Sequence, residues 1–334
     1  MTKNTLLKIA FGAAALLLLA FAVEVVLLIF ASILVALMLH ALSKPLAKRL
    51  GISEQIGLVI VVVLLVVSFT VIGWLIAPSI GEQVRELRAQ LPATLQKLQQ
   101  ELSRFAWLET LFDARTSSSA GEHAAASTVT GAVSGTLAAL GNTAVVVVIA
   151  LYLAFQPKPY INGLVRLFPV ARRERAREVL YAMGETLRWW LIGKGLSMVL
   201  VGIAVFIGLT ALGVPLAATL ALIAALLDFI PNIGPLLAAV PAALFALLQG
   251  PAQALYVIAL FVAIQSVEGY VLTPLIEQRT VSVPPALSLA ALVVAGLLFG
   301  WLGLLLAAPA TAALLVFVQM VYLQDTLGER DSGE

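Results

Sequence analysis

Residues 6–39 read LLKIAFGAAALLLLAFAVEVVLLIFASILVALML, and after Lys8 the only charged residue in this run is Glu24. A membrane-spanning helix needs about 20 consecutive apolar residues, so the run is too long for one straight span. Two interpretations remain open, namely two packed spans with a tight reversal near Ala22–Val25, or one long tilted helix. The length favours the reversal, which would place Glu24 close to a membrane interface.

The composition of the whole chain agrees with this reading. Of its 334 residues, 61% are hydrophobic and only 11% are charged, and the mean hydropathy is +1.05. A soluble domain carries about a quarter charged residues. The apolar runs are continuous rather than alternating as in barrel strands, and in lipid the backbone of such a run must be helical. We therefore predict an all-α polytopic membrane protein.

The sequence lacks the residues and motifs that several other classes of protein chemistry require. The chain has no cysteine, which excludes disulfides, thiol catalysis and cysteine-bound metals. It has no H-E-x-x-H, G-x-S-x-G or Walker motif and only two histidines, His40 and His123. A net charge of +2 gives no indication of nucleic-acid binding. We expect no enzyme activity, no cofactor and no metal site.

The chain divides by composition into six segments. They are three N-terminal spans in 1–78 with a basic loop at 40–55, an amphipathic helical region at 79–130, a fourth span at 131–156, a basic helical segment at 157–191, a C-terminal core at 192–324 and a polar tail at 325–334.

The region 79–126 has apolar residues at steps of three and four, beginning Ile80, Val84, Leu87 and Leu91. This spacing predicts amphipathic helices. They could pack on their own protein or form a contact between copies of the chain.

The distribution of basic residues predicts the orientation. Segment 157–194 holds eight Lys or Arg residues, Lys194 among them, against three acidic residues. The loop 40–55 and the N-terminus are also basic. By the positive-inside rule these three segments and both termini are cytoplasmic, and 79–130 faces outward.

Ionisable groups within apolar spans are costly and mark functional sites by default. Asp228 opens the sequence DFIPNIGP, which contains Pro231, Gly234 and Pro235 and is followed by Pro241. These residues interrupt a helix, and transporters aim such broken backbone at substrates or ions. The alternative is a tight turn in which Asp228 and Asn232 only cap the next helix.

Glu268 lies well inside a second apolar stretch, in the sequence QSVEGYVLTP. Gly269 would give room for a neighbouring backbone, and Pro274 would kink or end the helix. A buried carboxyl group could exchange a proton near neutral pH or bind a cation. Alternatively, Glu268 is simply paired with Arg279 or hydrogen-bonded across helices.

A third broken stretch runs from Pro284 through Gly300 and Gly303 to Pro309. Its glycines suit a helix reversal or a close crossing, and Pro309 would reset the following helix. We expect this stretch to be scaffold or gate.

The sequences DFIPNIGP, EGYVLTP and FGWLGLLLAAP resemble the C-terminal motifs of the autoinducer-2 exporter (PerM-type permease) family. The resemblance implies a location in a bacterial inner (cytoplasmic) membrane, about eight spans, a homo-oligomer, and transport of small molecules without a nucleotide-hydrolysing domain. It also implies that the residues matching the motifs can act in transport; these are Asp228, Pro231, Asn232, Gly234, Pro235, Glu268 and Pro274. Some members of this family are assigned export of quorum signals and others Na⁺(Li⁺)/H⁺ antiport.

Three functions therefore remain. The first is a secondary transporter that exports a small polar organic solute and couples it to a proton or cation through Asp228 or Glu268. The second is a Na⁺(Li⁺)/H⁺ antiporter that uses the same carboxylates. The third is a non-transporting membrane scaffold, which leaves both carboxylates without a role.

Overall fold

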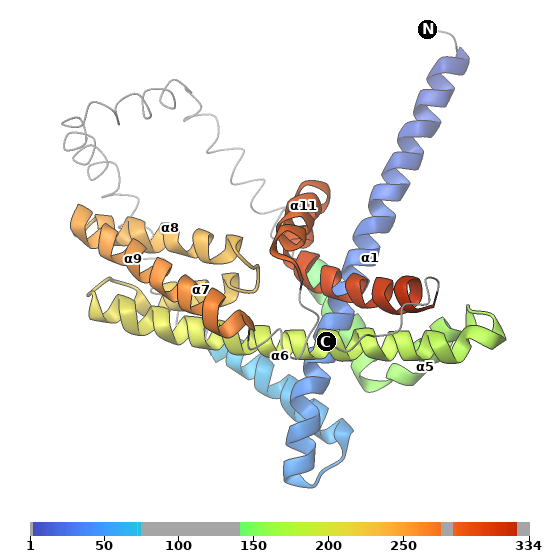
Figure 1. Ribbon diagram of the computed structural model, residues 1–334, viewed down its shortest axis with the longest axis horizontal. Helices are drawn as coiled ribbons and strands as arrows, with labels where there is room; N and C mark the ends of the chain where they lie inside the picture. Colours follow the sequence, from blue (N-terminus) through green and yellow to red (C-terminus); the bar gives the residue numbers. More distant parts are fainter. Residues whose placement is uncertain (1–2, 72, 75–140, 275–282, 326–334) are drawn as a thin grey trace. The chain divides into compact units, whose positions relative to one another are not determined.

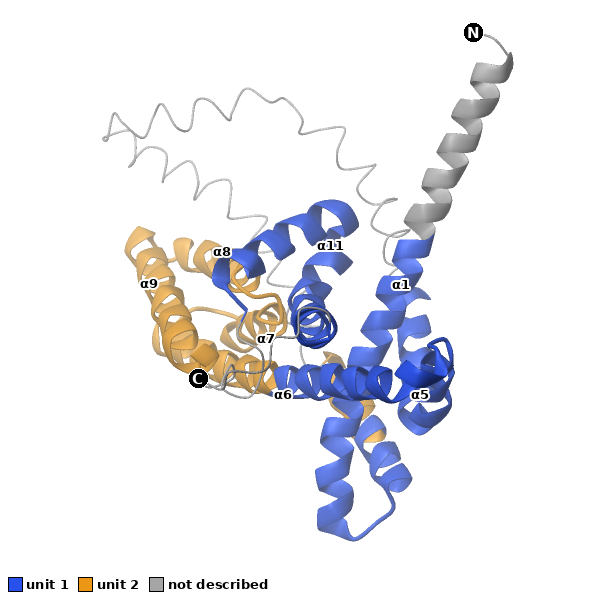
Figure 2. Ribbon diagram, turned by 45° about the vertical axis from the view of Figure 1, so that its right-hand side comes forward, with its two compact units in different colours: residues 1–62, 140–192, 276–334 blue, residues 63–139, 193–275 orange. Residues whose placement is uncertain are grey.

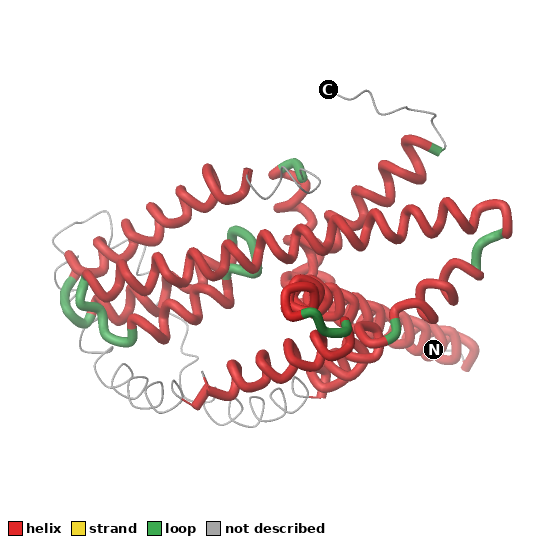
Figure 3. The backbone as a smooth tube through the Cα atoms, turned by 90° about the horizontal axis from the view of Figure 1, so that it is seen from below, coloured by secondary structure: helices red, strands yellow, loops and turns green. Residues whose placement is uncertain are grey.

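The computed structural model describes residues 3–71, 73–74, 141–274 and 283–325, and within these ranges there is no strand. The described elements are drawn in Figure 1, and Figure 3 distinguishes their helices from their loops. In chain order they are α1 (Lys3–Leu50), the helices Glu54–Val71 and Gly141–Phe155, α5 (Pro157–Arg166), the 3₁₀ turn η1 (Val170–Arg172), α6 (Arg173–Ala211), α7 (Ala217–Leu227), α8 (Ile233–Leu247), α9 (Pro251–Val267), the π-helix η2 (Glu268–Leu272), α11 (Pro285–Phe317) and the π-helix η3 (Val318–Gln324). The predicted amphipathic region 79–130 and Arg279 lie outside the described residues.

Within the described ranges, five helices are long and apolar enough to cross a membrane, or up to six if one bent pair is a single span. Their large apolar side chains are widely exposed; examples on Glu54–Val71 are Leu64, Val66, Val67 and Phe69. Lipid can cover such faces, whereas a soluble protein rarely leaves large contiguous apolar patches exposed. The all-α, multi-pass class is therefore confirmed, and the number of about eight spans stays a prediction.

The N-terminal run forms one helix. α1 continues without interruption from Lys3 to Leu50, so the favoured reversal near Ala22–Val25 is wrong and the alternative of one long helix is observed. The physical reason is local, because no glycine or proline stands at 22–25 to free the backbone from its helical hydrogen bonds. Glu24 accepts a hydrogen bond at Oε1 from Nδ2 of Asn142, at 3.3 Å.

The chain divides into two compact units, which Figure 2 distinguishes by colour. The described core of unit 2 consists of α7, α8, α9 and the part of α6 that begins at Gly193. Ala238, Ala242 and Ala246 are buried one turn apart on α8, where small side chains allow neighbouring helices to approach closely. Val205 and Val257 pack in the same core.

The chain breaks between α7 and α8. α7 ends at Leu227 and α8 begins at Ile233, as the residues of the DFIPNIGP motif predict. Asn232 has a φ of 65°, and a Cβ at Gly234 would lie 1.8 Å from the carbonyl oxygen of Leu227. Only glycine allows this close approach of the two helices.

The break is shorter than predicted. The sequence predicts an interruption at Pro241 as well, but Pro241 lies inside α8. A proline in the interior of a helix is tolerated in membrane proteins when neighbouring groups satisfy the freed backbone. Pro235 occupies the first turn of α8, where backbone donors have no helical partner in any case. With 11 and 15 residues, α7 and α8 rise about 17 and 22 Å, less than the roughly 30 Å of a bilayer core.

The predicted reversal at the last broken stretch is confirmed. Gly300 inside α11 has a φ of 60° and a ψ of −140°, which is not helical. A Cβ at Gly303 would meet the carbonyl oxygen of Ala295 at 2.0 Å, and one at Gly296 would meet the Leu304 side chain. The two arms of α11 therefore turn back on each other. Pro309 does not reset a helix, because it is buried inside the second arm.

The close packing at the α7–α8 break predicts a specific sensitivity to an added methyl group. Gly234→Ala should lower the free energy of unfolding by about 1–3 kcal/mol, because the Cβ must displace backbone rather than a flexible side chain. Thermal unfolding in detergent, followed by the loss of the monodisperse elution peak, measures the effect. Gly184→Ala is the matched control, since a Cβ there meets nothing within 4 Å among the described residues. An equal change in unfolding temperature for Gly234→Ala and Gly184→Ala would contradict the close packing at Gly234.

Candidate functional site

Two polar side chains of α6 point into the core of unit 2. Lys194 and Ser197 lie three residues apart, which places them on the same helix face. Lys194 is only 8% exposed and Ser197 only 1%. The ammonium group of Lys194 is therefore removed from solvent and needs acidic partners nearby.

Asp228 supplies the first of these partners. It is the residue directly after α7, at the start of the break, and it is completely buried. Its Oδ2 lies 2.9 Å from Nζ of Lys194 and 3.2 Å from Oγ of Ser197. The break between α7 and α8 thus places the Asp228 carboxylate next to α6.

Glu268 supplies the second acidic partner of Lys194. It stands at the junction between α9 and the π-helix η2 and is also buried. Its Oε1 lies 3.0 Å from Nζ of Lys194 and 2.8 Å from Oγ of Ser197, and its Oε2 accepts a hydrogen bond from Nε2 of Gln265 at 3.0 Å. We refer to Lys194, Ser197, Asp228 and Glu268 together as the buried charge cluster.

The buried charge cluster is not neutral when all its groups are ionised. Two carboxylates face one ammonium, so one negative charge is in excess. Ser197 has one hydroxyl hydrogen, which cannot satisfy Asp228 and Glu268 fully at the same time. Leaving a buried charge unpaired costs several kcal/mol. One further positive charge, such as a proton, would balance the cluster.

The two carboxylates differ in their remaining hydrogen bonds. Both oxygens of Glu268 have partners. Oδ1 of Asp228 is buried and has no hydrogen-bond partner in the described part of the chain. Buried polar atoms without a partner are rare and call for an explanation. Oδ1 of Asp228 can accept a hydrogen bond from a ligand or carry a proton.

The structure brings together Asp228 and Glu268, the two carboxylates that the sequence singled out. It does not bring Asn232 to them by any described contact. Asn232 is exposed and occupies the N-cap position of α8, but its side chain makes no cap hydrogen bond there. A Cβ at Gly269 would meet nothing within 4 Å among the described residues, and the predicted close approach there is not seen.

The backbone changes from α-helical to π-helical at Glu268. In η2 the backbone N–H of Thr273 donates to the carbonyl of Glu268, five residues back. Such π-helical turns occur inside α-helices, frequently at functional sites. Pro274 follows Thr273 after this turn and is still helical, as the last described residue of the segment. The predicted kink or helix end at Pro274 stays a prediction.

Sequence reasoning missed Lys194 and Ser197. It counted Lys194 with the cytoplasmic basic residues, whereas the structure pairs its ammonium with two buried carboxylates. A signal was present, because the apolar part of α6 begins before Lys194 and continues to Ala211. A lysine within such a stretch, with a serine three residues later, is a candidate for a buried partner of Asp228.

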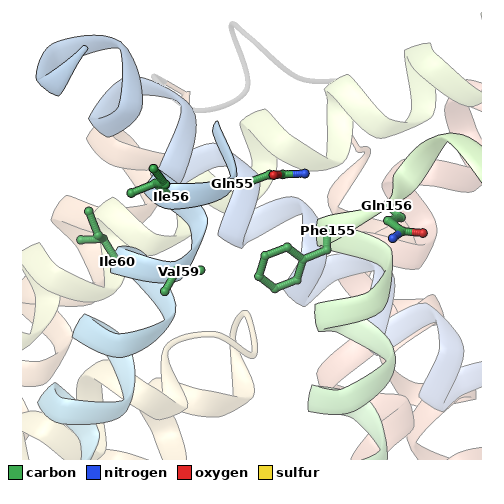
Figure 4. Close-up of a pocket in the computed structure, with 6 residues that line it drawn as sticks. All are labelled: Gln55, Ile56, Val59, Ile60, Phe155 and Gln156. Carbon is green, nitrogen blue, oxygen red and sulfur yellow. The ribbon is translucent and has the colours of Figure 1, made fainter. Parts of the chain in front are cut away.

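A separate pocket of about 500 Å³ lies in unit 1. Figure 4 shows Phe155 pointing toward the helix Glu54–Val71 across this pocket. The lining residues are Gln55, Ile56, Val59, Ile60, Phe155 and Gln156. None of them is ionisable or was predicted as a site residue. In the described ranges, no group of three or more His, Cys, Asp or Glu residues could hold a metal ion.

The charge balance predicts different costs for two substitutions in the buried charge cluster. Lys194→Met leaves two buried carboxylates without a cation and should cost about 3–5 kcal/mol of unfolding free energy. Asp228→Asn keeps the Lys194–Glu268 pair intact, so it should cost only about 1–2 kcal/mol. Unfolding of the purified variants in detergent tests this order, and a Lys194→Met variant as stable as wild type would contradict the ion pairs.

Comparison with known proteins places the chain among transport proteins. YueF of Bacillus subtilis (strain 168) is 26% identical over 306 residues, which cover 86% of this chain and 83% of YueF. YhhT of Escherichia coli (strain K12) is 25% identical over 300 residues, covering 87% and 84%. The AI-2 transport protein TqsA of the same strain is 31% identical over 145 residues, covering 43% and 41%. The family model of the AI-2E family transporter matches residues 9–322, and the chain belongs to this family of membrane transport proteins.

Proposed function

We propose that this protein is a secondary transporter that exports a small polar organic solute, and that the buried charge cluster couples export to a proton gradient. The observation that carries the proposal is the meeting of Lys194, Asp228 and Glu268 inside apolar helices of unit 2. Membership in the transporter family supports the general role. The substrate class and the coupling are our proposals.

The placement of the three charges favours a role in a conformational change. Each charge comes from a different element, namely α6, the end of α7 and the end of α9. Two of these positions are irregular, since Asp228 begins the α7–α8 break and Glu268 begins a π-helix. A change in the charge of one carboxyl group alters its attraction to Lys194. The cluster can therefore favour one arrangement of these elements over another.

A proton fits the excess charge better than Na⁺ does. The Lys194 ammonium already lies between Asp228 Oδ2 and Glu268 Oε1, at 2.9 and 3.0 Å. A sodium ion between the carboxylates would have to displace this ammonium, whereas a proton can bind to Asp228 Oδ1 without moving it. Exchange of Na⁺ or Li⁺ for protons has no support in the described residues or in the family description.

The substrate class is proposed from the family and from one relative. TqsA is named as an AI-2 transport protein, and it is 31% identical to this chain over part of its length. We infer a small, uncharged, hydroxyl-rich solute of the autoinducer-2 kind, whose hydroxyl groups could donate to Asp228 Oδ1. A non-transporting scaffold would gain nothing from an ionic cluster that is costly to bury.

A flux assay in proteoliposomes tests the proposal. Vesicles loaded with labelled autoinducer-2 should lose it faster when the external buffer is acidified, because proton entry drives the exit of the solute. In Asp228→Asn this acceleration should fall at least tenfold, while flux without a pH gradient continues.

Glu24→Gln is the matched control, since it also converts a carboxylate of an apolar helix to an amide but lies outside the buried charge cluster. It should keep the acceleration. Acceleration that persists in Asp228→Asn would remove the coupling role of the cluster. If the wild-type protein moves no solute with or without a pH gradient, the proposed substrate class is wrong. If the flux depends on a Na⁺ gradient instead of a pH gradient, the proposed coupling ion is wrong.

A further inference from the structure

The chain turns sharply after the helix Gly141–Phe155. The next helix, α5, is bent by 89° from it, with Gln156 at the break. If Gly141–Phe155 runs across a membrane, a helix at a right angle to it lies along the membrane surface. α5 and the residues that follow it to Arg173 form a segment that we call the basic surface segment, 157–173.

The basic surface segment presents an apolar face. Tyr160, Leu164 and Leu167 follow one another at spacings of four and three residues, which places them on one side of a helix. All three are exposed, and Leu167 is 79% exposed. Val170, just beyond the end of α5, is 76% exposed. These side chains have little described protein to pack against.

The same segment is strongly basic. It contains Lys158, Arg166, Arg172 and Arg173 and no acidic residue. The first three are exposed, and Arg173 is partly so. Helices that combine an apolar face with basic residues lie in the interface of membranes and are attracted to anionic lipids.

Hydrogen bonds fix the segment to α6. Nη2 of Arg177 donates to Oδ1 of Asn162 at 3.3 Å, and Nε of Arg173 donates to the carbonyl of Phe168 at 3.2 Å. Asn162 is in α5, so the bond from Arg177 joins the two helices directly. The apolar and basic side chains are therefore held in a defined arrangement rather than on a free loop.

We propose that the basic surface segment is a binding site for anionic phospholipid headgroups. Tyr160, Leu164, Leu167 and Val170 enter the boundary between headgroups and acyl chains, and the basic side chains contact the phosphates. This site is distinct from the buried charge cluster and does not depend on the proposed transport function. Anionic lipid would hold α5 along the membrane and, through Arg177, steady the N-terminal part of α6.

Because the natural chain has no cysteine, a single Leu167→Cys variant can be labelled with a fluorescent donor at one position. The full-length labelled protein is reconstituted in phosphatidylcholine vesicles that contain traces of acceptor-labelled phosphatidylglycerol or acceptor-labelled phosphatidylcholine. Energy transfer measures how strongly each lipid gathers at the segment. We expect clear enrichment of phosphatidylglycerol over phosphatidylcholine, and about a fivefold loss of this preference for each charge removed by Lys158→Gln or Arg166→Gln.

Arg188→Gln is the matched control, because it removes a basic residue that is already paired with Glu185 at 2.9 Å. It should leave the preference unchanged. Equal energy transfer to the two lipids, or an equal loss in Arg188→Gln, would overturn the proposal.

Discussion

Burial of the Lys194 ammonium constrains the rest of unit 2. A lysine inside apolar helices is tolerated only if acidic groups reach it, and both groups that do so come from distant parts of the chain. The break after α7 brings Asp228 to 2.9 Å, and the end of α9 brings Glu268 to 3.0 Å. Gly234 allows α8 to return close to Leu227, so the break that places Asp228 stays compact.

This constraint links the fold to the coupling that we propose. A neutral apolar core would be stable in one arrangement, whereas two carboxylates that share one ammonium and one hydroxyl can be rebalanced by a single proton. The unpartnered Oδ1 of Asp228 is where such a change can occur within the described residues. In our proposal, the irregular backbone at Asp228 and Glu268 allows α6, α7 and α9 to shift when the charge of a carboxyl group changes. In unit 1 the basic surface segment carries exposed apolar and basic side chains, which we propose bind anionic lipid.

Much of this could be predicted from the sequence, because breaks have local causes. The reversal at Gly300 and the break at 228–232 follow from glycine and proline, and charges in apolar runs singled out Asp228 and Glu268. The predictions that the structure does not support concern residues whose behaviour depends on their surroundings in the folded chain. The length of 6–39 allowed a hairpin, but without a helix-breaking residue at 22–25 the helix continues. Pro241 is accommodated inside α8. The pairing of Lys194 was missed because a lysine near the end of a span usually reaches the interface, and its partners Asp228 and Glu268 lie far along the chain.

The most direct test of this account is a double-mutant cycle on Lys194→Met and Glu268→Gln, measured as unfolding free energy in mixed micelles titrated with sodium dodecyl sulfate. If the two groups are paired, the double variant should lose at least about 1 kcal/mol less than the sum of the single variants. The pair Lys194→Met and Glu24→Gln serves as the reference and should be additive. Additivity within about 0.5 kcal/mol for Lys194 and Glu268 would contradict the buried charge cluster and the coupling mechanism built on it.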